Sequence, residues 1–348
     1  MKIIIVGNMG YIGPLVVRQL REAHADSTLV GFDTGYFAHC MTSSRLLPEC
    51  RLNAQHFGDV RSFPEKLLEG VNAIVYLAAI SNDPMGNAFE AVTLDVNYRA
   101  GVALARKAKA AGATSFVFAS SCSVYGFAED GARNEKSPVN PLTAYARSKV
   151  FAERDLASLA DSRFNVTCLR FATACGMSDR LRLDLVVNDF VASAVAAQKI
   201  TILSDGSPWR PLIHVRDMAR AIDWAIQRQS RNGGNSLIVN AGSDSWNYQV
   251  KTLAETVAEI IPGVEVSINK SAQPDRRSYK VDFSLFKSLA PEHQPKYDLP
   301  TTIKELRAGL EEMCFADRDF RKSHLMRLNA LSALRNKRLL TEDLRWTT

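Results

Sequence analysis

The sequence lacks three features that would place a protein in a membrane or outside the cell. It has no apolar run of eighteen residues, no charged-then-apolar leader, and no C-x-x-C pair among its six scattered cysteines. The first two absences count against membrane insertion and secretion, and the third counts against a disulfide framework and a zinc site. We therefore expect a cytoplasmic protein with free thiols, no membrane contact and no bound metal.

Linkers rich in proline, glycine and serine are also absent, as are internal repeats and low-complexity segments. The chain has 348 residues and 46% hydrophobic content, so it can bury a large core. One large domain or two coupled domains are expected. Without a linker, any second domain is interwoven with the first.

The formal net charge of +6 does not indicate nucleic acid, because the basic excess is mostly local. Basic residues near the C-terminus alternate with leucines at helical spacing, which favours solvated faces of amphipathic helices over a phosphate-binding surface. The basic residues are Arg318, Arg321, Lys322, Arg327, Arg335, Lys337, Arg338 and Arg345, and the leucines are Leu325, Leu328, Leu331, Leu334, Leu339 and Leu340.

Short apolar runs alternate with helical patterns along most of the chain. Strands are expected at 3–6, 28–33, 73–79, 115–120, 164–170 and 236–240, and helices at 14–24, 92–111, 145–159, 184–199, 215–228 and 248–261. Parallel strands joined by crossover helices make a sheet covered on both faces. The pattern predicts an α/β, Rossmann-type doubly wound parallel sheet, with a smaller interwoven α+β part at the C-terminal side.

A glycine-rich turn, Gly7-Asn8-Met9-Gly10-Tyr11-Ile12-Gly13, joins the first expected strand to the first expected helix. The first glycine lets the chain turn off the strand, the second lets a pyrophosphate approach the backbone, and the third lets the helix pack closely on the sheet. The unpaired N–H groups and the dipole at the helix start favour an anion there.

Asp33 strengthens this interpretation, because it ends the second expected strand twenty positions after Gly13. That separation is typical of an acid that binds an adenosine ribose. A carboxylate would repel a 2′-phosphate, and no arginine follows closely to neutralise one. The predicted cofactor is therefore NAD rather than NADP.

Tyr145 and Lys149 are four residues apart and therefore share one face of an expected helix. A tyrosine with its ordinary pKa of about 10 is a poor base at neutral pH, but a nearby ammonium stabilises the phenolate. Such a phenolate can take a proton from a hydroxyl while hydride leaves the carbon. The spacing also occurs by chance on surface helices, so the pair gains weight only from the motifs around it.

Further motifs agree in order and spacing with one known family. They are Gly58-Asp59-Val60, Leu77-Ala78-Ala79, Asp95-Val96-Asn97-Tyr98-Arg99, Ser120-Ser121-Cys122-Ser123-Val124-Tyr125-Gly126, Arg210-Pro211-Leu212-Ile213-His214-Val215-Arg216-Asp217 and Asn240-Ala241-Gly242. From Met1 to about Glu312 the chain resembles the extended short-chain dehydrogenase/reductases, especially the nucleotide-sugar epimerases and dehydratases.

The resemblance implies how NAD would be held. The pyrophosphate would lie on the glycine loop, the adenosine ribose on Asp33, and the nicotinamide ribose against Lys149, with Asn97 ordering the backbone nearby. The implied cofactor-binding residues are Gly7, Gly10, Tyr11, Ile12, Gly13, Asp33, Asp59, Val60, Leu77, Ala78, Ala79, Asn97, Tyr145 and Lys149.

The resemblance also implies a catalytic set of Ser121, Tyr145 and Lys149, in which Ser121 relays a substrate proton to Tyr145. In the sugar 4,6-dehydratases an Asp and a Glu follow the catalytic hydroxyl, whereas here Cys122 and Ser123 follow it, so dehydration is not expected. Cys122 is expected to be a small buried residue.

The expected substrate is a nucleotide-diphosphate sugar. Arg210 and Arg277 are candidates for the diphosphate, because a guanidinium suits bidentate phosphate contact. Thr173 stands where many sugar epimerases have an asparagine that touches substrate. The implied substrate-binding residues are Ser81, Ser121, Cys122, Ser123, Tyr145, Thr173, Asn188, Arg210 and Arg277.

The expected NAD-binding domain covers residues 1–170, with 210–240 returning to it. Residues 171–209 and 241–314 are expected to bind the nucleotide sugar, and 315–348 to form a helical extension past the family's usual end. The family pattern further implies a homodimer, formed by the helices that carry Asn97 and Tyr145.

The favoured function is an NAD-dependent nucleotide-sugar epimerase that inverts C4 through a 4-keto intermediate. An NAD(P)-dependent 4-keto-sugar reductase or dehydrogenase would use the same three residues and stays open as an alternative. A non-catalytic NAD sensor is a remote alternative, because a sensor has no need of a proton relay through Ser121 and Tyr145.

Overall fold

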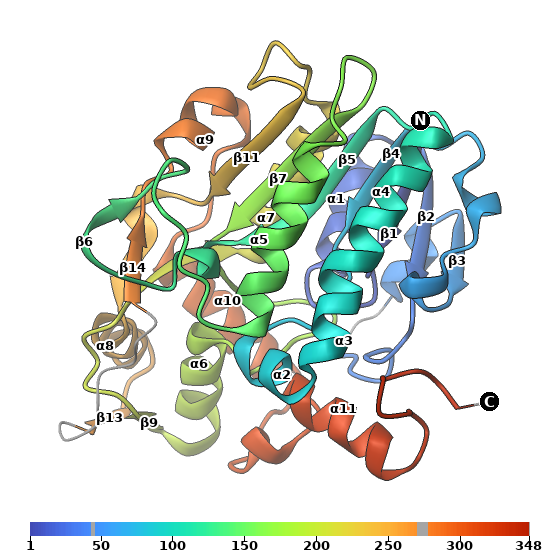
Figure 1. The fold of residues 1–348 in the computed structure, drawn as a ribbon. Coiled ribbons are helices and arrows are strands. Elements are labelled where there is room, and N and C mark those ends of the chain that lie inside the picture. The colour runs from blue at the N-terminus through green and yellow to red at the C-terminus, as the bar shows by residue number, and fades with distance from the viewer. Residues whose placement is uncertain (43–45, 270–277, 348) are drawn as a thin grey trace.

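The computed structural model describes residues 1–42, 46–269 and 278–347, without the side chains of 129 and 130. Its largest element is a seven-stranded sheet in the order β11-β7-β5-β4-β1-β2-β3, with every pair of neighbours parallel (Figure 1). The strands are β1 (Lys2–Val6), β2 (Thr28–Asp33), β3 (Ala54–Phe57), β4 (Ala73–Tyr76), β5 (Ser115–Ser121), β7 (Asn165–Phe171) and β11 (Ser236–Ala241).

Both faces of the sheet are buried, because side chains alternate between the faces along each strand. Ile3 and Ile5 join one apolar cluster, and Ile4 and Val6 join the other. Helices α1 (Gly13–Ala23) and α7 (Val215–Gln227) cover the first face, and α4 (Gly101–Ala110) and α5 (Ala144–Ala157) cover the second (Figure 1). The predicted doubly wound α/β fold is confirmed.

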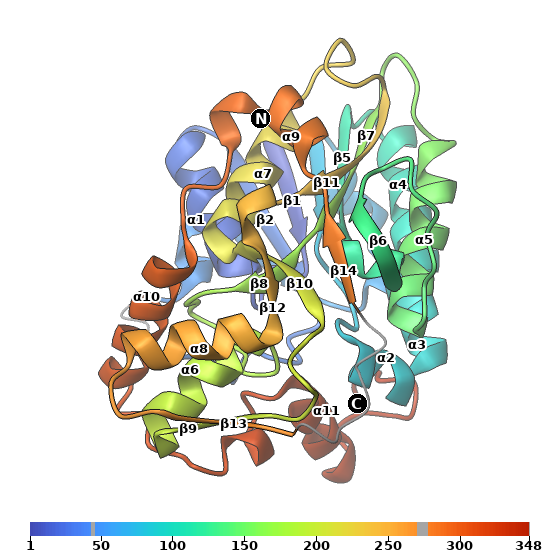
Figure 2. The same ribbon diagram turned by 90° about the vertical axis from the view of Figure 1, so that its left-hand side faces the viewer.

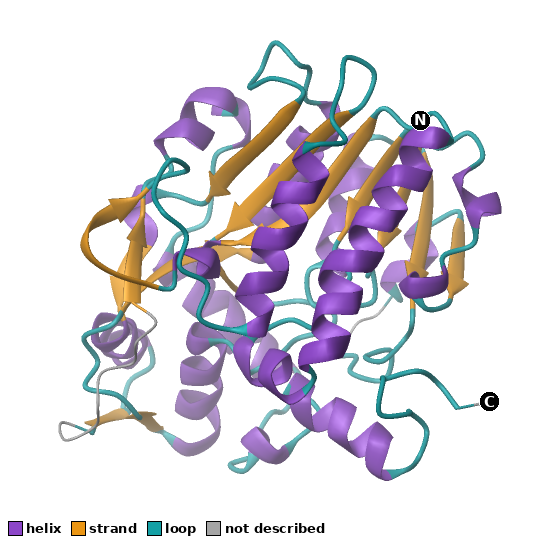
Figure 3. Ribbon diagram, viewed as in Figure 1, coloured by secondary structure: helices purple, strands orange, loops and turns teal. Residues whose placement is uncertain are grey.

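A smaller lobe lies beyond the carboxyl ends of the strands (Figures 2 and 3). It holds three small sheets, β8-β10-β12, β9-β13 and β6-β14. Its strands are β6 (Phe127–Arg133), β8 (Thr173–Cys175), β9 (Lys199–Ile202), β10 (Trp209–His214), β12 (Asn247–Gln249), β13 (Glu265–Ile268) and β14 (Ser278–Val281). Its helices are α6 (Val186–Ala197), α8 (Val250–Ile260) and α10 (Leu299–Glu312). A short helix, α9 (Ser284–Leu289), packs beside β11.

Three elements differ from the sequence prediction. The expected helix at 92–111 begins as α3 (Glu90–Leu94), passes through a π-helical turn at Asp95–Ala100, and continues as α4. A short helix that was not predicted, α2 (Asp83–Ala88), precedes it and is capped by Asn82. Strand β10 pairs with β8 and β12, so the chain returns to the large sheet with α7 rather than at residue 210.

The C-terminal extension contains one helix, α11 (Arg327–Asn336), between irregular segments (Figure 1). Leu331, Leu340 and Leu344 pack into the same core cluster as Ile4, so the extension is part of the body. The expectation that its basic residues are solvated is wrong for Arg327, which is only 1% exposed. Within the described ranges, no helix is long and apolar enough to cross a bilayer.

The C-terminal end of α10 generates a stability prediction. Backbone N–H groups of Cys314 and Phe315 bond back to Glu311 and Leu310 at 2.9 Å, which puts Cys314 at the left-handed position of a Schellman motif with φ 51°. Glycine adopts this φ without a Cβ clash, so we expect Cys314→Gly to raise the free energy of unfolding by about 1 kcal/mol. Urea denaturation measures it.

Cys314→Ala is the matched control, because it removes the thiol and keeps the Cβ. It should give no such gain. Equal stabilisation by the two substitutions would show that the thiol, and not the backbone conformation, lowers the free energy of unfolding of the wild type.

Candidate active site

One large cavity of about 980 Å³ lies at the carboxyl ends of the parallel strands. The strand order reverses around β1, which pairs with β2 on one side and β4 on the other, and a crevice opens where connections leave in opposite directions. Gly7 after β1, Asp33 at the end of β2, Leu77 after β4 and Ser121 at the end of β5 all line this cavity. The sheet therefore brings together residues that are far apart in the sequence.

The glycine loop needs its glycines for close backbone approach. Gly7 has φ 88°, and a Cβ there would lie 2.5 Å from the backbone nitrogen of Ala78. A Cβ on Gly13 would lie 2.0 Å from the carbonyl oxygen of Asn8. Helix α1 starts on this loop with neither a capping side chain nor an acidic residue in its first turn. Its unpaired N–H groups are therefore available to an anionic group in the cavity.

Asp33 is held beside this loop by two backbone donors. Its carboxylate accepts hydrogen bonds from Gly35 N at 2.7 Å and from Met9 N at 3.0 Å, while burial raises its pKa. The glycine loop, the start of helix α1 and the Asp33 carboxylate together fit a dinucleotide. Its pyrophosphate would lie on the loop and one ribose on Asp33. Nearby, Asp59 pairs with Arg61 at 2.6 Å on the cavity wall.

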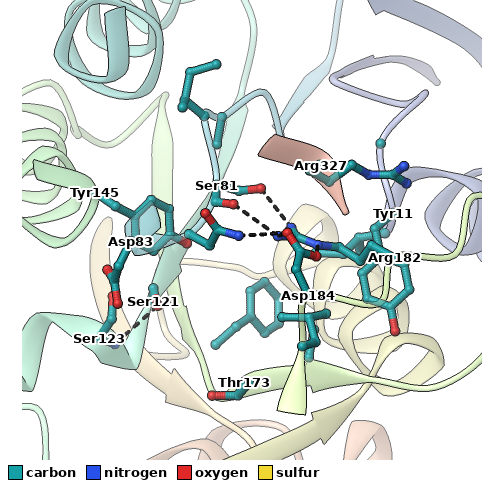
Figure 4. A pocket seen from close by; sticks show the side chains of 18 of the residues that line it. Tyr11, Ser81, Asp83, Ser121, Ser123, Tyr145, Thr173, Arg182, Asp184 and Arg327 are labelled. Atoms are coloured by element: carbon teal, nitrogen blue, oxygen red, sulfur yellow. Dashed lines mark hydrogen bonds and ion pairs between the residues drawn. The ribbon is translucent and has the colours of Figure 1, made fainter. Parts of the chain in front are cut away.

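Ser121 and Tyr145 lie on the opposite side of the cavity from Tyr11 and Arg327 (Figure 4), and Lys149 also lines the cavity. Ser121 hydrogen-bonds the Tyr145 phenol and accepts a bond from Ser123 N at 3.1 Å. The Lys149 ammonium is 2% exposed, donates to the carbonyl oxygen of Ala119 at 2.7 Å, and lies 5.4 Å from the centre of the Tyr145 ring. The four-residue spacing thus puts Tyr145 and Lys149 on the same face of α5, as expected.

Burial works against the charged forms of both groups. Burial raises the pKa of Tyr145 to about 12, and the hydrogen bond with Ser121 opposes this rise. Burial lowers the pKa of Lys149 to about 7, and the attraction of the Glu153 carboxylate opposes this fall. A phenolate and an ammonium at this separation stabilise each other in a low-dielectric site. The charged form of each group therefore favours the charged form of the other.

A charged network that the sequence did not reveal crosses the cavity (Figure 4). Arg182 bonds Asp184 at 2.6 Å, and its other nitrogens donate to the hydroxyl and carbonyl oxygens of Ser81 at 2.9 and 3.1 Å. Asn82 donates to Asp184 at 2.8 Å. A signal was present: charged residues alternate with Leu181 and Leu183, both 0% exposed, as in an extended segment with one buried face.

Three expected contacts do not line the cavity. The Cys122 thiol is 1% exposed and donates to the carbonyl oxygen of Arg170 at 3.1 Å, and burial raises its pKa. Asn97 binds both backbone groups of Ile80 from behind the cavity wall. Asn188 donates to the Tyr11 hydroxyl at 2.9 Å and accepts from the amide of Gly176 at 3.1 Å. All three position the wall, and the expected substrate contacts of Cys122 and Asn188 are not observed.

The remaining expected residues lie as follows. The Ser123 hydroxyl lines the cavity and is buried without a partner among the described residues. Arg277 lies outside the described residues. The other expected site residues that line the cavity are Gly7, Gly10, Tyr11, Ile12, Gly13, Asp33, Asp59, Val60, Leu77, Ala78, Ala79, Ser81, Ser121, Tyr145, Lys149, Thr173 and Arg210.

The glycine loop and Asp33 are typical of a dinucleotide-binding fold, and comparison with known proteins makes the assignment specific. Residues 3–242 match the NAD dependent epimerase/dehydratase family, so the chain belongs to that family. The match confirms the predicted cofactor, NAD, and the predicted class of enzyme. No group of three or more metal-ligating side chains occurs in the part of the chain that the structure describes.

Similar proteins include both reaction types of the family. UDP-glucose 4-epimerase of Corynebacterium glutamicum is 25% identical over 296 residues, which cover 79% of this chain and 85% of the relative. The dTDP-glucose 4,6-dehydratase of Streptomyces griseus is 26% identical over 239 residues, covering 66% and 71%. MoeE5, solved in complex with UDP-glucose and NAD, shares the fold with a TM-score of 0.76 and 24% identity, over 90% of this chain and all of that one.

The burial of Lys149 predicts a pH dependence of stability without ligands. Its pKa is lowered from 10.5 to about 7, so between these values the unfolded chain binds a proton that the folded chain releases. The contribution of Lys149 to the free energy of unfolding therefore increases as pH rises from about 7 to 10. We expect Lys149→Met to be more stable than the wild type at pH 7, by a margin that shrinks towards pH 10.

Chemical denaturation at several pH values measures this margin. Lys136→Met, at an exposed lysine, is the matched control and should differ little from the wild type. Parallel curves for Lys149→Met and the wild type would contradict the burial argument.

Proposed function

We propose that the protein is a nucleotide-diphosphate-sugar epimerase that inverts C4 through a 4-keto intermediate. The observation that carries this proposal is the shared cavity of Ser121, Tyr145 and the glycine loop, with Lys149 buried behind Tyr145. The similarity to UDP-glucose 4-epimerases supports the same reaction type. Arg210, from β10 of the smaller lobe, and Ser123, from the turn after β5, line the cavity and are the proposed contacts of the nucleotide sugar.

Each catalytic residue has a separate task in this mechanism. Tyr145, stabilised as phenolate by Lys149, accepts the proton of the C4 hydroxyl, and Ser121 relays that proton and orients the sugar oxygen. NAD supplies a reversible hydride acceptor for C4 when it is bound. Tyr145 returns the proton to the same oxygen after the sugar has presented its other face. Nothing is consumed, so the substrate and product have equal mass.

The surroundings of Ser121 argue against dehydration. Elimination of water needs an acid and a base beside the keto sugar, and a buried thiol with a raised pKa supplies neither. Cys122 also donates to a backbone carbonyl, away from the cavity. Mass spectrometry with a panel of UDP-, GDP-, CDP- and dTDP-sugars tests the reaction. A new product of unchanged mass supports epimerisation, a gain or loss of two hydrogens means net redox, and a loss of water means dehydration.

Tyr145→Phe separates catalysis from binding. We expect turnover to fall at least about a hundredfold, because the general base is lost, while NAD binding stays close to that of the wild type. Product formation by NMR and NAD affinity by calorimetry measure the two effects. Tyr248→Phe, at a tyrosine of β12 outside the cavity, is the matched control and should keep full activity. A fully active Tyr145→Phe variant would exclude the mechanism.

We also propose a homodimer formed by the helices that carry Asn97 and Tyr145. The partly exposed rings of Tyr98 and Phe151 pack together at 5.7 Å on this side of the molecule, where a partner helix would cover them. Sedimentation at micromolar concentration should give a dimer, and Phe151→Asp should shift it towards monomer. A wild-type monomer under these conditions would rule out the interface.

A further inference from the structure

Arg327 is an unusual residue in the C-terminal extension. It opens helix α11, it is 1% exposed, and it lines the cavity that holds the glycine loop. It lies at the dinucleotide end, beside Tyr11 and away from Tyr145 (Figure 4). The family match ends at residue 242, so this contact comes from a part of the chain that the match does not cover.

The guanidinium of Arg327 is only partly satisfied. One terminal nitrogen donates to the carbonyl oxygen of Arg180 at 2.7 Å, and the cation lies 4.7 Å from the centre of the Phe37 ring. The other terminal nitrogen is buried and has no partner among the residues that the structure describes. The two neighbouring arginines differ, because Arg180 pairs with Glu49 and Arg182 with Asp184. No carboxylate within the described ranges pairs with Arg327.

A buried cation without a counter-ion is expensive, because its hydration is lost and nothing replaces it. Burial and the two nearby arginines lower the pKa of Arg327 to about 10, so the group stays charged at neutral pH. An apolar side chain at this position removes that desolvation cost, so we expect the substitution not to destabilise the unliganded protein. The residue therefore makes physical sense if an anion occupies the adjoining cavity.

The contacts around Arg327 place it next to the glycine loop. The Ser178 hydroxyl donates to the carbonyl oxygen of Tyr11, in the glycine loop, at 2.6 Å, and it accepts from Arg180 N at 3.2 Å. Arg327 binds the carbonyl of the same Arg180. On its other side, Phe37 follows Asp33 by four residues and also lines the cavity. Arg327 thus stands between the pyrophosphate loop and the segment after the ribose acid.

The extension is anchored beyond Arg327 as well. Arg345 pairs with Asp59 at 3.3 Å, the Trp346 indole donates to the carbonyl oxygen of Thr34 at 2.6 Å, and the Tyr36 hydroxyl donates to the carbonyl of Leu344. These contacts surround the adenosine end of the site. They fix the extension on the C-terminal side of the helix that presents the guanidinium.

We propose that Arg327 binds the pyrophosphate of NAD from the side opposite the glycine loop, so that the C-terminal extension completes the cofactor site. The chemistry is charge-assisted hydrogen bonding between a guanidinium and phosphate oxygens. This inference rests on the NAD site of the proposed function and does not depend on which sugar carbon reacts.

Binding measurements on cofactor-free protein test it. We expect Arg327→Met to weaken NAD and ADP binding about 10- to 100-fold in calorimetry, because a hydrogen-bonded charge is lost. Adenosine, which lacks the diphosphate, should bind both proteins equally, and Arg327→Lys should recover part of the affinity. UDP, which serves as a probe for the substrate diphosphate, should bind the Arg327→Met variant as tightly as it binds the wild type. Arg318→Met, at an exposed arginine of the same extension, is the matched control.

Thermal unfolding of the same samples distinguishes a ligand contact from a structural one. Without ligand, Arg327→Met should melt at or above the wild-type temperature, and the shift produced by NAD should shrink. Unchanged NAD affinity would overturn the proposal, as would an equal loss of adenosine binding or a melting temperature that falls without ligand. Loss of UDP binding with intact NAD binding would assign Arg327 to the substrate instead and also overturn it. If the wild type is inactive on every nucleotide sugar but still binds NAD through Arg327, the proposed epimerase function is refuted and the role of Arg327 stands.

Discussion

The parallel pairing of β1 between β2 and β4 is the constraint on which the site depends. Because all seven strands run the same way, their carboxyl ends share one edge, and the reversal of strand order around β1 opens a crevice at that edge. Gly7, Asp33, Leu77 and Ser121 reach it from four different strands. A one-residue slip in a strand would exchange its two faces and move these ends, so core packing and site geometry are specified together.

The site also depends on charges that the fold keeps out of water. Arg170 and Glu153 form a pair at 2.7 Å whose side chains are 7% and 3% exposed, and Ser120 donates to the same carboxylate at 2.5 Å. This pair is satisfied within the protein, so it fixes the relation between β5, β7 and α5. Lys149 and Arg327 are different, because each has a single protein acceptor and borders the cavity. The terminal nitrogen of Arg327 that has no partner among the described residues is therefore one that needs an explanation.

Much of the site was predictable because its signals are local. The glycine loop, the acid that ends β2 and the Tyr145/Lys149 spacing each depend on one strand, one turn or one helix. The same holds for the fold, since alternation of apolar runs with helical patterns implies a parallel sheet. The burial of Cys122 was predicted as well. The limits of this reasoning are visible in the π-helical turn around Asn97, which helical periodicity does not reveal.

The alternation around Arg182 is a signal of an extended segment, but its contacts with Ser81 across the cavity arise from the tertiary fold, as does the role of Arg327. In the sequence, Arg327 is one of several basic residues among leucines, and the usual assignment for such a residue is the solvated face of a helix. Only the packing of Leu331 and Leu344 into the core turns the first residue of α11 inward. No periodicity within the extension distinguishes Arg327 from its exposed neighbours.

The C-terminal extension beside the proposed adenosine end of the site bears on the choice between an epimerase and a net reductase. A net reductase must exchange its dinucleotide in every cycle, so contacts that retain the cofactor slow its turnover. An epimerase regenerates NAD within the site and gains from retention. In the proposed NAD site, contacts between Trp346 and Thr34, and between Arg345 and Asp59, hold the extension against two cavity-lining residues at the adenosine end. An extension that holds the cofactor in place is therefore the arrangement that an epimerase favours, and it supports that reaction on grounds independent of the catalytic residues.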